Sequence, residues 1–363
     1  MNAVRYRMPA EWEPHAATWI AWPHNPEDWP NKFQPIPWVY AEIVRHLSRV
    51  EDVHILVNDL AAERRATAIL KRAGANLARV HFHRWPTDRV WLRDSGPIFV
   101  KDQGGEKAIT NWKFNAWAKY DNWHNDDRIP HRVATLHKLP EIIPEVSPAG
   151  ERRKPHRIVL EGGSIDVNGA GLLLTTEECL LSEIQQRNPG IGDEAATRAA
   201  LERAFRDYLG IAQTIWLNRG CAGDDTHGHV DDITRFVPVS SDQPDTILTC
   251  VEPSTADENH LPLAENLDRL RSARNLRGKP LRILELPMPA PVVFEGQRLP
   301  ASYANFYIAN GLVLVPTFND ANDRHALKII ADCFPTREVV GIHAVDLVWG
   351  LGTLHCLSQQ EPA

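Results

Sequence analysis

Cysteine is scarce in this sequence of 363 residues, and its cysteines do not fall into pairs. The five are odd in number and widely spaced, at Cys179, Cys221, Cys250, Cys333 and Cys356. Such spacing argues against the disulfide framework of a small secreted domain and against a zinc knuckle. A reducing compartment fits this usage.

Long apolar runs and an excess of positive charge are also absent. No segment has the length and apolarity of a membrane span, and the first residues lack the apolar core of a signal peptide. We therefore expect a cytoplasmic protein with no membrane partner. The net charge of −7 argues against a general affinity for nucleic acid. It is compatible with a cationic ligand, although an ordinary solvated surface would explain it equally well.

Short apolar runs alternate with amphipathic segments along the whole chain. Strands are predicted at 53–57, 157–160, 172–175, 246–251, 281–286 and 312–315. Helices are predicted at 38–47, 194–208, 259–273 and 323–334. The alternation predicts an α/β fold. The stretches that begin at Glu161 and at Tyr303 share one plan, and an internal repeat of strand, strand, helix and strand would explain both.

Cys356 is a candidate nucleophile near the end of the chain. It follows His355 in a stretch that contains Gly350 and Gly352, where a thiol could be exposed. A thiol attacks as the thiolate, so it needs neighbours that hold or accept its proton. Acid- or histidine-bearing segments at 91–97, 160–164 and 226–232 could supply them.

His227, His229 and Asp231 occupy alternate positions of the last of these segments. On an extended strand they would lie on one face, because side chains alternate with a period of two. His229 is then a candidate general acid or base, since its ordinary pKa is close to neutrality. A surface strand with hydrogen-bonded histidines is the alternative.

Asp94 and Glu161 both lie beside turns and could have structural roles only. With Asp231 they make three carboxylates for one histidine, more than a cysteine protease needs. They suit a cationic substrate, because a planar guanidinium offers five donors that carboxylates accept in bidentate fashion.

Six short blocks extend this picture from about Met8 to the C-terminus. They are Trp91-x-Arg93-Asp94-x-Gly96-Pro97, Asn111-Trp112-x-Phe114-Asn115-Ala116-Trp117, Glu161-Gly162-Gly163, Gly228-His229-Val230-Asp231, Ser302-Tyr303-x-Asn305-Phe306-Tyr307 and His355-Cys356-x-x-Gln359-Gln360. Together and in this order they resemble the agmatine deiminase and bacterial-type peptidylarginine deiminase family of the guanidino-group-modifying superfamily. The resemblance implies a pentein fold, a five-bladed α/β propeller of ββαβ units around a central site, with residues 1–363 as a single catalytic domain.

The resemblance also implies a role for each site residue. Cys356 matches the nucleophile, His229 the general acid/base, and Glu161 the acid beside that histidine, while Asp94 and Asp231 match the carboxylates that grip the guanidinium. Further substrate contacts are expected from Trp91, Trp117, Asn305 and Gly352. No metal and no organic cofactor is expected.

The implied reaction is hydrolysis of agmatine to N-carbamoylputrescine and ammonia through a covalent thiouronium, a step of polyamine biosynthesis. The expected partner is a small cationic guanidino compound, and a homodimer is one possible assembly.

Three positions depart from the family pattern. Leu351 and Thr353 replace small or polar residues of the usual Gly-Gly-Gly-Asn-Ile-His-Cys sequence, and His227 stands where Asn is typical. Peptidyl-arginine or another guanidine is therefore an alternative substrate. A zinc amidohydrolase with His227, His229 and Asp231 as metal ligands is the alternative from another class. Residues 117–127 have the aromatic and acidic side chains that could bind the amine end of agmatine, or they could form a surface loop.

Overall fold

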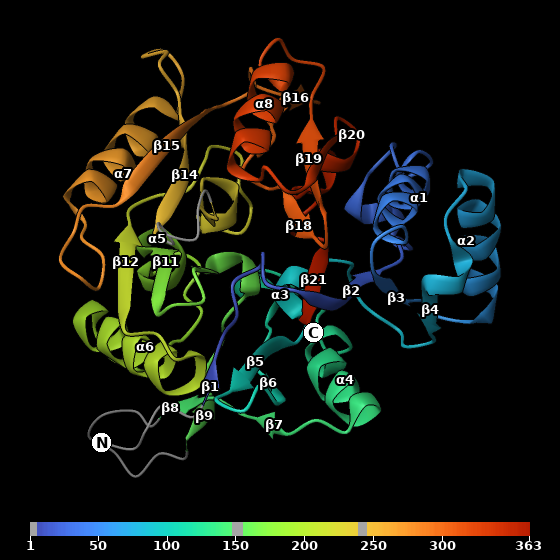
Figure 1. The fold of residues 1–363 in the computed structure, drawn as a ribbon, viewed down its shortest axis with the longest axis horizontal. Coiled ribbons are helices and arrows are strands. Elements are labelled where there is room, and N and C mark those ends of the chain that lie inside the picture. The colour runs from blue at the N-terminus through green and yellow to red at the C-terminus, as the bar shows by residue number, and fades with distance from the viewer. Residues whose placement is uncertain (1–5, 147–154, 239–244) are drawn as a thin grey trace.

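A computed structural model describes residues 6–146, 155–238 and 245–363. Within these ranges, five sheets of three or four strands share one plan: an antiparallel pair is extended by a parallel strand, with a helix in the parallel connection. Figure 1 shows the five sheets lying around the middle of the molecule, each with its helices toward the outside. The described residues contain no helix with the length and apolarity needed to cross a membrane.

Four of these units are continuous in the sequence. The first contains β5 (Ile98–Asp102), β6 (Lys107–Thr110), α4 (Ile129–His137) and β7 (Glu141–Ile142), with β1 (Tyr6–Arg7) added at the edge of β5. The second contains β10 (Asp166–Val167), β11 (Leu172–Thr176), α5 (Glu177–Leu181), α6 (Glu194–Leu209) and β12 (Gln213–Leu217). The third contains β13 (Thr234–Val237), β14 (Thr246–Val251), α7 (His260–Ser272) and β15 (Arg282–Pro287). The fourth contains β18 (Tyr307–Ala309), β19 (Leu312–Thr317), α8 (Asp323–Cys333) and β20 (Glu338–His343).

The fifth unit joins the two ends of the chain. Its strands are β21 (Ser358–Pro362), β2 (His15–Ala21), β3 (Asp52–Leu56) and β4 (Val80–His83), and its helices are α1 (Ile36–Leu47) and α2 (Leu60–Ala73). Strand β21 pairs antiparallel with β2, and β2 pairs parallel with β3. Because β21 begins two residues after Cys356, this pairing also fixes the chain around the thiol. Small hairpins of β8 (Glu145–Val146) with β9 (His156–Arg157), and of β16 (Val293–Phe294) with β17 (Gln297–Arg298), lie outside the five units.

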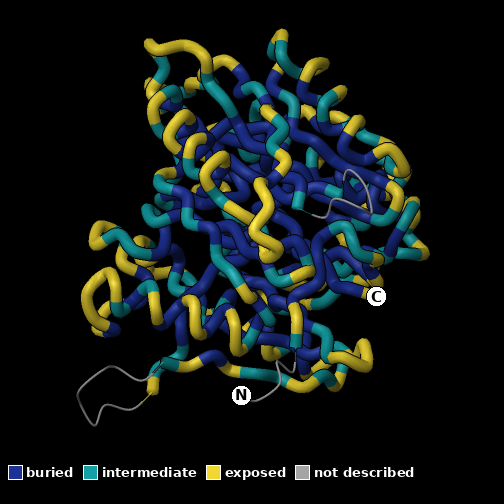
Figure 2. The backbone as a smooth tube through the Cα atoms, turned by 60° about the vertical axis from the view of Figure 1, so that its left-hand side comes forward, coloured by how far each residue is buried: buried dark blue, intermediate teal, exposed yellow. Residues whose placement is uncertain are grey.

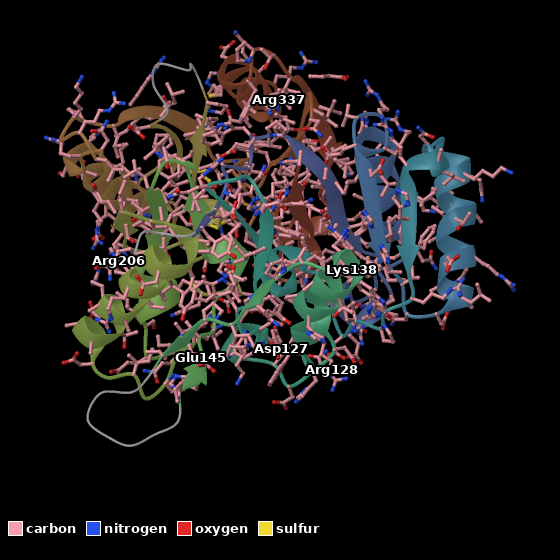
Figure 3. The ribbon with its side chains drawn as sticks, turned by 60° about the horizontal axis from the view of Figure 1, so that its bottom comes forward. Asp127, Arg128, Lys138, Glu145, Arg206 and Arg337 are labelled. Carbon is pink, nitrogen blue, oxygen red and sulfur yellow. The ribbon has the colours of Figure 1, made fainter. Side chains whose placement is uncertain are left out.

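The central strands are buried on both faces, and the helices are buried on one. All of Leu312, Val313, Leu314 and Val315 in β19 are buried, as expected for a strand covered by a helix on one side and by other units on the other. Figure 2 shows the buried segments in dark blue in the interior of the molecule and the exposed segments in yellow toward its rim. Charged side chains such as Arg206 on α6 and Lys138 after α4, both labelled in Figure 3, are exposed.

Most predicted elements match the structure to within two residues. Both stretches predicted as a repeat form an antiparallel pair followed by helix and parallel strand. The strand predicted at 157–160 is wrong, because β9 ends at Arg157. The Asn188 side chain accepts from Val159 N at 2.8 Å and donates to Val159 O at 2.9 Å, so these backbone groups are satisfied without a neighbouring strand.

Arg235 of β13 ties several units together in the interior. Its fully buried guanidinium donates to Asp166 Oδ2 at 2.6 Å, to Glu11 Oε2 at 2.7 Å and to Phe306 O at 2.8 Å. Burial would raise the pKa of Glu11, but the charges of Arg235 and His355 outweigh it and hold the pKa well below its usual range. The buried carboxylates of Asp166 and Glu11 therefore depend on the Arg235 guanidinium for charge compensation.

We expect Arg235→Met to lower the free energy of unfolding by about 3–5 kcal/mol, because it leaves buried carboxylates without their partner. Arg271→Met is the matched control: Arg271 is 56% exposed and pairs only with surface acids, so we expect a change within about 0.5 kcal/mol. Denaturant unfolding followed by circular dichroism measures both. Equal effects of the two substitutions would contradict the structural role of Arg235.

Candidate active site

A cavity of about 550 Å³ contains four of the residues predicted for the site in its lining: Trp91, Asp94, Trp117 and Cys356. The other lining residues are mostly polar or acidic: Asn25, Glu27, Asp28, Arg89, Tyr120, Asp121, Asn122, Asp225, Thr226, Gly350 and Leu351.

Residues far apart in the sequence meet beside this cavity, and each lies shortly before the first strand of a unit: Asp94 before β5, Glu161 before β10 and Asp231 before β13. Asp94 lies on α3 (Leu92–Ser95), and Glu161 precedes the short 3-10 turn of Gly162–Ser164. Asp231 lies on the 3-10 turn of Val230–Asp232, directly after His229. Gly163 brings them together, since a Cβ at this position would lie 2.6 Å from His229 Nδ1 and 2.8 Å from Asp94 Oδ1. Only glycine allows this approach.

The Cys356 thiol is held by Asn305. Asn305 Nδ2 donates to Cys356 Sγ at 3.0 Å, while its Oδ1 accepts from Thr353 Oγ1 at 2.7 Å and from His355 N at 3.1 Å. With its oxygen engaged in this way, the amide must present its nitrogen to the sulfur. The expectation of an exposed thiol is wrong, because Cys356 is only 4% exposed although it lines the cavity.

His229 lies among three carboxylates without a hydrogen bond to any of them. Its Nδ1 is 3.8 Å from Asp94 Oδ1 and 4.0 Å from Asp231 Oδ1, and its Nε2 is 4.0 Å from Glu161 Oε2. Both ring nitrogens, Glu161 Oε2 and Asp231 Oδ1 are buried and lack hydrogen-bond partners among the described residues. Buried polar atoms are rarely left in this state, so the arrangement is built to receive a polar group.

Burial and charge set the protonation states of the empty site. Burial raises the pKa of the Cys356 thiol well above its ordinary value, and the carboxylates of Asp231, Asp232 and Asp94 raise it further. Burial would lower the pKa of His229, but Asp94 and other neighbours reverse this and raise it well above its ordinary value. Burial raises the pKa of Asp94 to about 6, against the opposing charge of His229. At neutral pH the empty site therefore holds a neutral thiol and an imidazolium.

Trp117 reaches Asp94 through an unusual turn. Its Nε1 donates to Asp94 Oδ2 at 2.9 Å, and Gly163 N donates to Asp94 Oδ1 at 3.0 Å. Ala116, Trp117 and Ala118 have φ values of 49°, 59° and 56°, a left-handed conformation that costs energy for residues other than glycine. Such strain is typical of residues that are held for a binding site.

The predicted strand with His227, His229 and Asp231 on one face is wrong. Asp224 Oδ2 accepts from Gly228 N at 2.8 Å and from His229 N at 2.9 Å, which folds this segment into a turn. His227, at φ 64°, faces Ser182, with 3.0 Å between Nε2 and Oγ. No group of potential metal ligands within the described ranges combines His227 with His229 and Asp231. The three side chains that the zinc alternative needs as ligands are therefore not brought together.

Several site residues escaped the sequence interpretation. His355 places Nδ1 2.6 Å from Asp231 Oδ2 and Nε2 2.7 Å from Glu11 Oε2, so it holds Asp231 in place. Arg187 Nε donates to Glu161 Oε1 at 3.0 Å in a fully buried ion pair. His355 lies next to the thiol in the sequence, and Glu11 lies where the resemblance to the family begins, but neither position predicts these contacts. Arg187 lies in a segment without a recognisable motif.

Two clusters in the site have the residue types that hold metal ions. They are Glu161 with Cys179 and His229, and Asp231 with Asp232 and Cys356, with ligand atoms within 4.8 Å of one another in each. Both use the groups already described around the thiol and the histidine, so a metal there would compete with a cationic ligand.

Comparison with known proteins decides the family. Residues 7–362 match the sequence profile described as Porphyromonas-type peptidyl-arginine deiminase. The chain belongs to this deiminase family. The family resemblance predicted from the six blocks is thereby confirmed.

Relatives of this deiminase family match along nearly the whole chain. An agmatine deiminase of Pseudomonas aeruginosa is 34% identical over 388 residues, covering 100% of this chain and 97% of its own. The solved structure of an agmatine deiminase of Enterococcus faecalis superposes with a TM-score of 0.85 at 28% identity, covering 98% of this chain and 96% of its own. A substrate-bound agmatine deiminase of C. jejuni gives a TM-score of 0.83 at 26% identity, covering 99% and 96%. The deiminase fold is therefore shared over its full length.

The protonation state of the Cys356 thiol can be tested in the substrate-free protein. Because its thiol pKa is raised, the thiolate fraction at pH 7 is below that of an ordinary cysteine, and we expect alkylation by iodoacetamide to be slow. The rate should rise with pH without a plateau below about pH 9. Mass spectrometry of the Cys356 peptide measures this rate. The peptide of Cys250, which is buried and outside the cavity lining, reports any unfolding. A plateau below about pH 8 would contradict the raised pKa.

Proposed function

We propose that this protein hydrolyses agmatine to N-carbamoylputrescine and ammonia. Family membership and full-length similarity to agmatine deiminases support this reaction. The observation that carries the proposal is a set of buried carboxylates around Cys356 and His229. Glu161 Oε2, Asp231 Oδ1 and both ring nitrogens of His229 lack hydrogen-bond partners among the described residues. A guanidinium supplies the missing positive charge and the missing hydrogen-bond donors at once.

Binding places the guanidinium between Asp94 and Asp231. Asp94 is oriented by Trp117 and Gly163, and Asp231 by His355, so neither carboxylate must reorganise when the substrate arrives. The positive charge offsets the carboxylates that raise the pKa of Cys356. Substrate binding therefore favours ionisation of the thiol at the moment when an electrophilic carbon lies beside it. The thiol proton leaves to solvent through the cavity, because His229 already carries its own proton.

The covalent steps then follow from the protonation states. The Cys356 thiolate adds to the guanidinium carbon, and the His229 imidazolium gives its proton to the departing nitrogen, which leaves as ammonia. A thiouronium remains on the sulfur. Neutral His229 takes a proton from water as the water oxygen attacks the same carbon, and collapse expels the thiol and releases the ureido product. Glu161, fixed by Arg187, stabilises the charged form of His229.

The acidic cavity lining supports agmatine over arginine. Glu27, Asp28, Asp121 and Asp225 line the cavity, and Asp28 Oδ2 is buried without a hydrogen-bond partner among the described residues. Arg89 also lines the cavity and pairs with Asp28 at 3.1 Å, but the four acidic residues outnumber it, so the lining favours a primary amine over the α-carboxylate of free arginine. The prediction that residues 117–127 contribute agrees with their position, since Trp117, Tyr120, Asp121 and Asn122 are part of the lining.

At the level of the fold, we propose that the five units form a five-bladed pentein propeller and one catalytic domain. The shared strand plan of the units and their arrangement around the middle of the molecule support this. Nearly full coverage by a single family profile supports one domain. The cytoplasmic location and the homodimer stay predictions from the sequence.

A substrate panel with Cys356→Ser tests the reaction. We expect ammonia release from agmatine to exceed that from arginine or an arginyl peptide by at least about tenfold in kcat/KM, a difference of roughly 1.4 kcal/mol. Cys356→Ser should lose more than roughly a hundredfold in kcat, because a neutral hydroxyl lacks the nucleophilicity of a thiolate. Cys333→Ser, a buried thiol in α8 outside the cavity lining, is the matched control and should keep full activity.

Thermal unfolding of each variant ensures that loss of activity is not loss of fold. Preference for an arginyl peptide would replace agmatine with peptidyl-arginine as the substrate. Activity of the folded Cys356→Ser variant near that of the parent would remove Cys356 from the role of nucleophile.

A further inference from the structure

A second cluster of polar side chains lies on one face of the fifth sheet. Strand register places Trp19 of β2 opposite both His54 of β3 and Gln359 of β21. Glu361, two residues beyond Gln359, is therefore on the same face as Trp19 and His54. His137, the last residue of α4, covers this face from the first unit, with its ring centroid 5.8 Å from that of His54. None of these five residues lines the active-site cavity.

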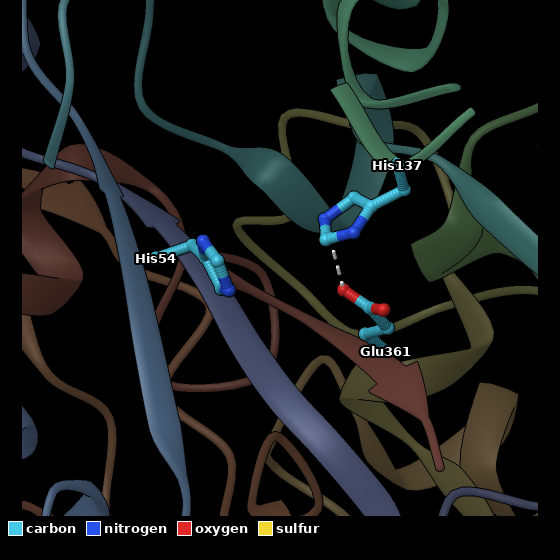
Figure 4. A group of neighbouring side chains, drawn as sticks. All are labelled: His54, His137 and Glu361. Carbon is cyan, nitrogen blue, oxygen red and sulfur yellow. Dashed lines mark ion pairs between the residues drawn. The ribbon is translucent and has the colours of Figure 1, made fainter. Parts of the chain in front are cut away.

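Three of these side chains converge as metal ligands do. One ligand atom each from His54, His137 and Glu361 lie within 4.8 Å of one another. Figure 4 shows the His54 ring on one side and His137 with Glu361 on the other, facing the same space. His137 Nε2 is 3.6 Å from Glu361 Oε2, too long for a hydrogen bond, and this buried nitrogen has no hydrogen-bond partner among the described residues.

The distances suit a small divalent ion. Tetrahedral ligands at the zinc–ligand distance of about 2.0–2.1 Å lie roughly 3.3–3.5 Å apart. The His137–Glu361 pair is already close to this separation at 3.6 Å, and His54, whose ligand atom lies within 4.8 Å of the other two, would have to approach by at most about 1.5 Å. A fourth position is left for water or another side chain.

Neighbouring groups orient the ligands in the way that outer-shell partners of metal sites do. His54 Nδ1 lies 2.8 Å from His83 Nε2, which leaves Nε2 of His54 as the ring nitrogen free to bind, and the His54 ring stacks on Trp19 at 4.2 Å. Glu361 Oε1 accepts from Lys107 Nζ at 2.7 Å, and Oε2 accepts from Trp19 Nε1 at 2.9 Å with a further lone pair available.

Among the described residues that bond to Glu361, Lys107 carries the positive charge that opposes a metal. Lys107 Nζ is directed to Oε1, whereas Oε2 is the oxygen that lies 3.6 Å from His137 Nε2.

We propose that His54, His137 and Glu361 bind one divalent transition-metal ion of the zinc class. Imidazole and carboxylate ligands together suit Zn²⁺, with Ni²⁺ and Cu²⁺ as competitors. The ion joins β3, α4 and β21, which belong to two different units. Since β21 begins two residues after Cys356, the ion anchors the strand that follows the nucleophile.

Zinc titration of the chelator-treated full chain tests this site without relying on activity. We expect one Zn²⁺ to bind by calorimetry, and the melting temperature to rise by roughly 3 °C at a hundredfold excess over the dissociation constant. His54→Ala and His137→Ala should each weaken binding at least about tenfold. His343→Ala, an exposed histidine on β20, is the matched control and should bind as the parent does. Cys356→Ser should also retain binding.

Cobalt spectra give a readout on the unmodified protein, independent of whether a variant folds. Co²⁺ at the proposed site should give ligand-field bands without the thiolate charge-transfer band of a cysteine ligand. That band, or zinc binding that survives both histidine substitutions and disappears in Cys356→Ser, would place the ion in the active site and overturn the proposal. Failure of the parent protein to bind Zn²⁺ would overturn it as well.

Discussion

The site depends on negative charge that the fold buries and leaves incompletely paired. Asp94, Asp231 and Glu161 are each at most 5% exposed and surround His229. Arg187 and His355 satisfy one side of this cluster, while Glu161 Oε2 and Asp231 Oδ1 find no hydrogen bond within the described chain. Burial of a carboxylate is costly unless a cation compensates it. In the proposed complex, a guanidinium between these residues is that cation. The same negative charge that would bind it raises the pKa of the Cys356 thiol in the substrate-free protein.

The fold makes this charge cluster possible by collecting residues from the connections of its units. The segment before the first strand of each unit carries one of these residues: Asp94 before β5, Glu161 before β10, Asp231 before β13, Asn305 before β18 and Cys356 before β21. Arg235 and Glu11 connect these segments in the interior. Arg235 donates to Asp166 and to Glu11, and Glu11 in turn lies 2.7 Å from His355 Nε2. The pairing of β21 with β2 completes the fifth unit and holds the loop of Cys356. Stability and chemistry therefore share the same buried polar network.

Local patterns in the sequence were sufficient for the α/β class, the repeated plan and most elements, because apolar periodicity is set within each segment. They were insufficient wherever a distant side chain decides the backbone. Asn188 satisfies the backbone of Val159 and removes a predicted strand, and Asp224 folds the segment of His227 into a turn. The candidate site residues were predicted through short motifs that match the family. Arg187, Glu11 and the cluster around His54 could not be found in this way, since only the tertiary fold brings their partners within reach.

The structure places the two residues that depart from the family pattern next to the thiol. Leu351 lines the cavity at φ 68°, and Thr353 donates to Asn305.

The central claim is that the guanidinium of the substrate, and not the empty protein, ionises Cys356. Rapid acid quench of single-turnover reactions with agmatine, followed by mass spectrometry of the Cys356 peptide, measures this directly as the rate of adduct formation against pH. The account predicts an adduct with the mass of agmatine less ammonia, formed at a rate that is already near its maximum at about pH 7, although alkylation of the free thiol still rises above about pH 9. Adduct formation that rises in parallel with alkylation of the free thiol, or turnover without any adduct on Cys356, would contradict it.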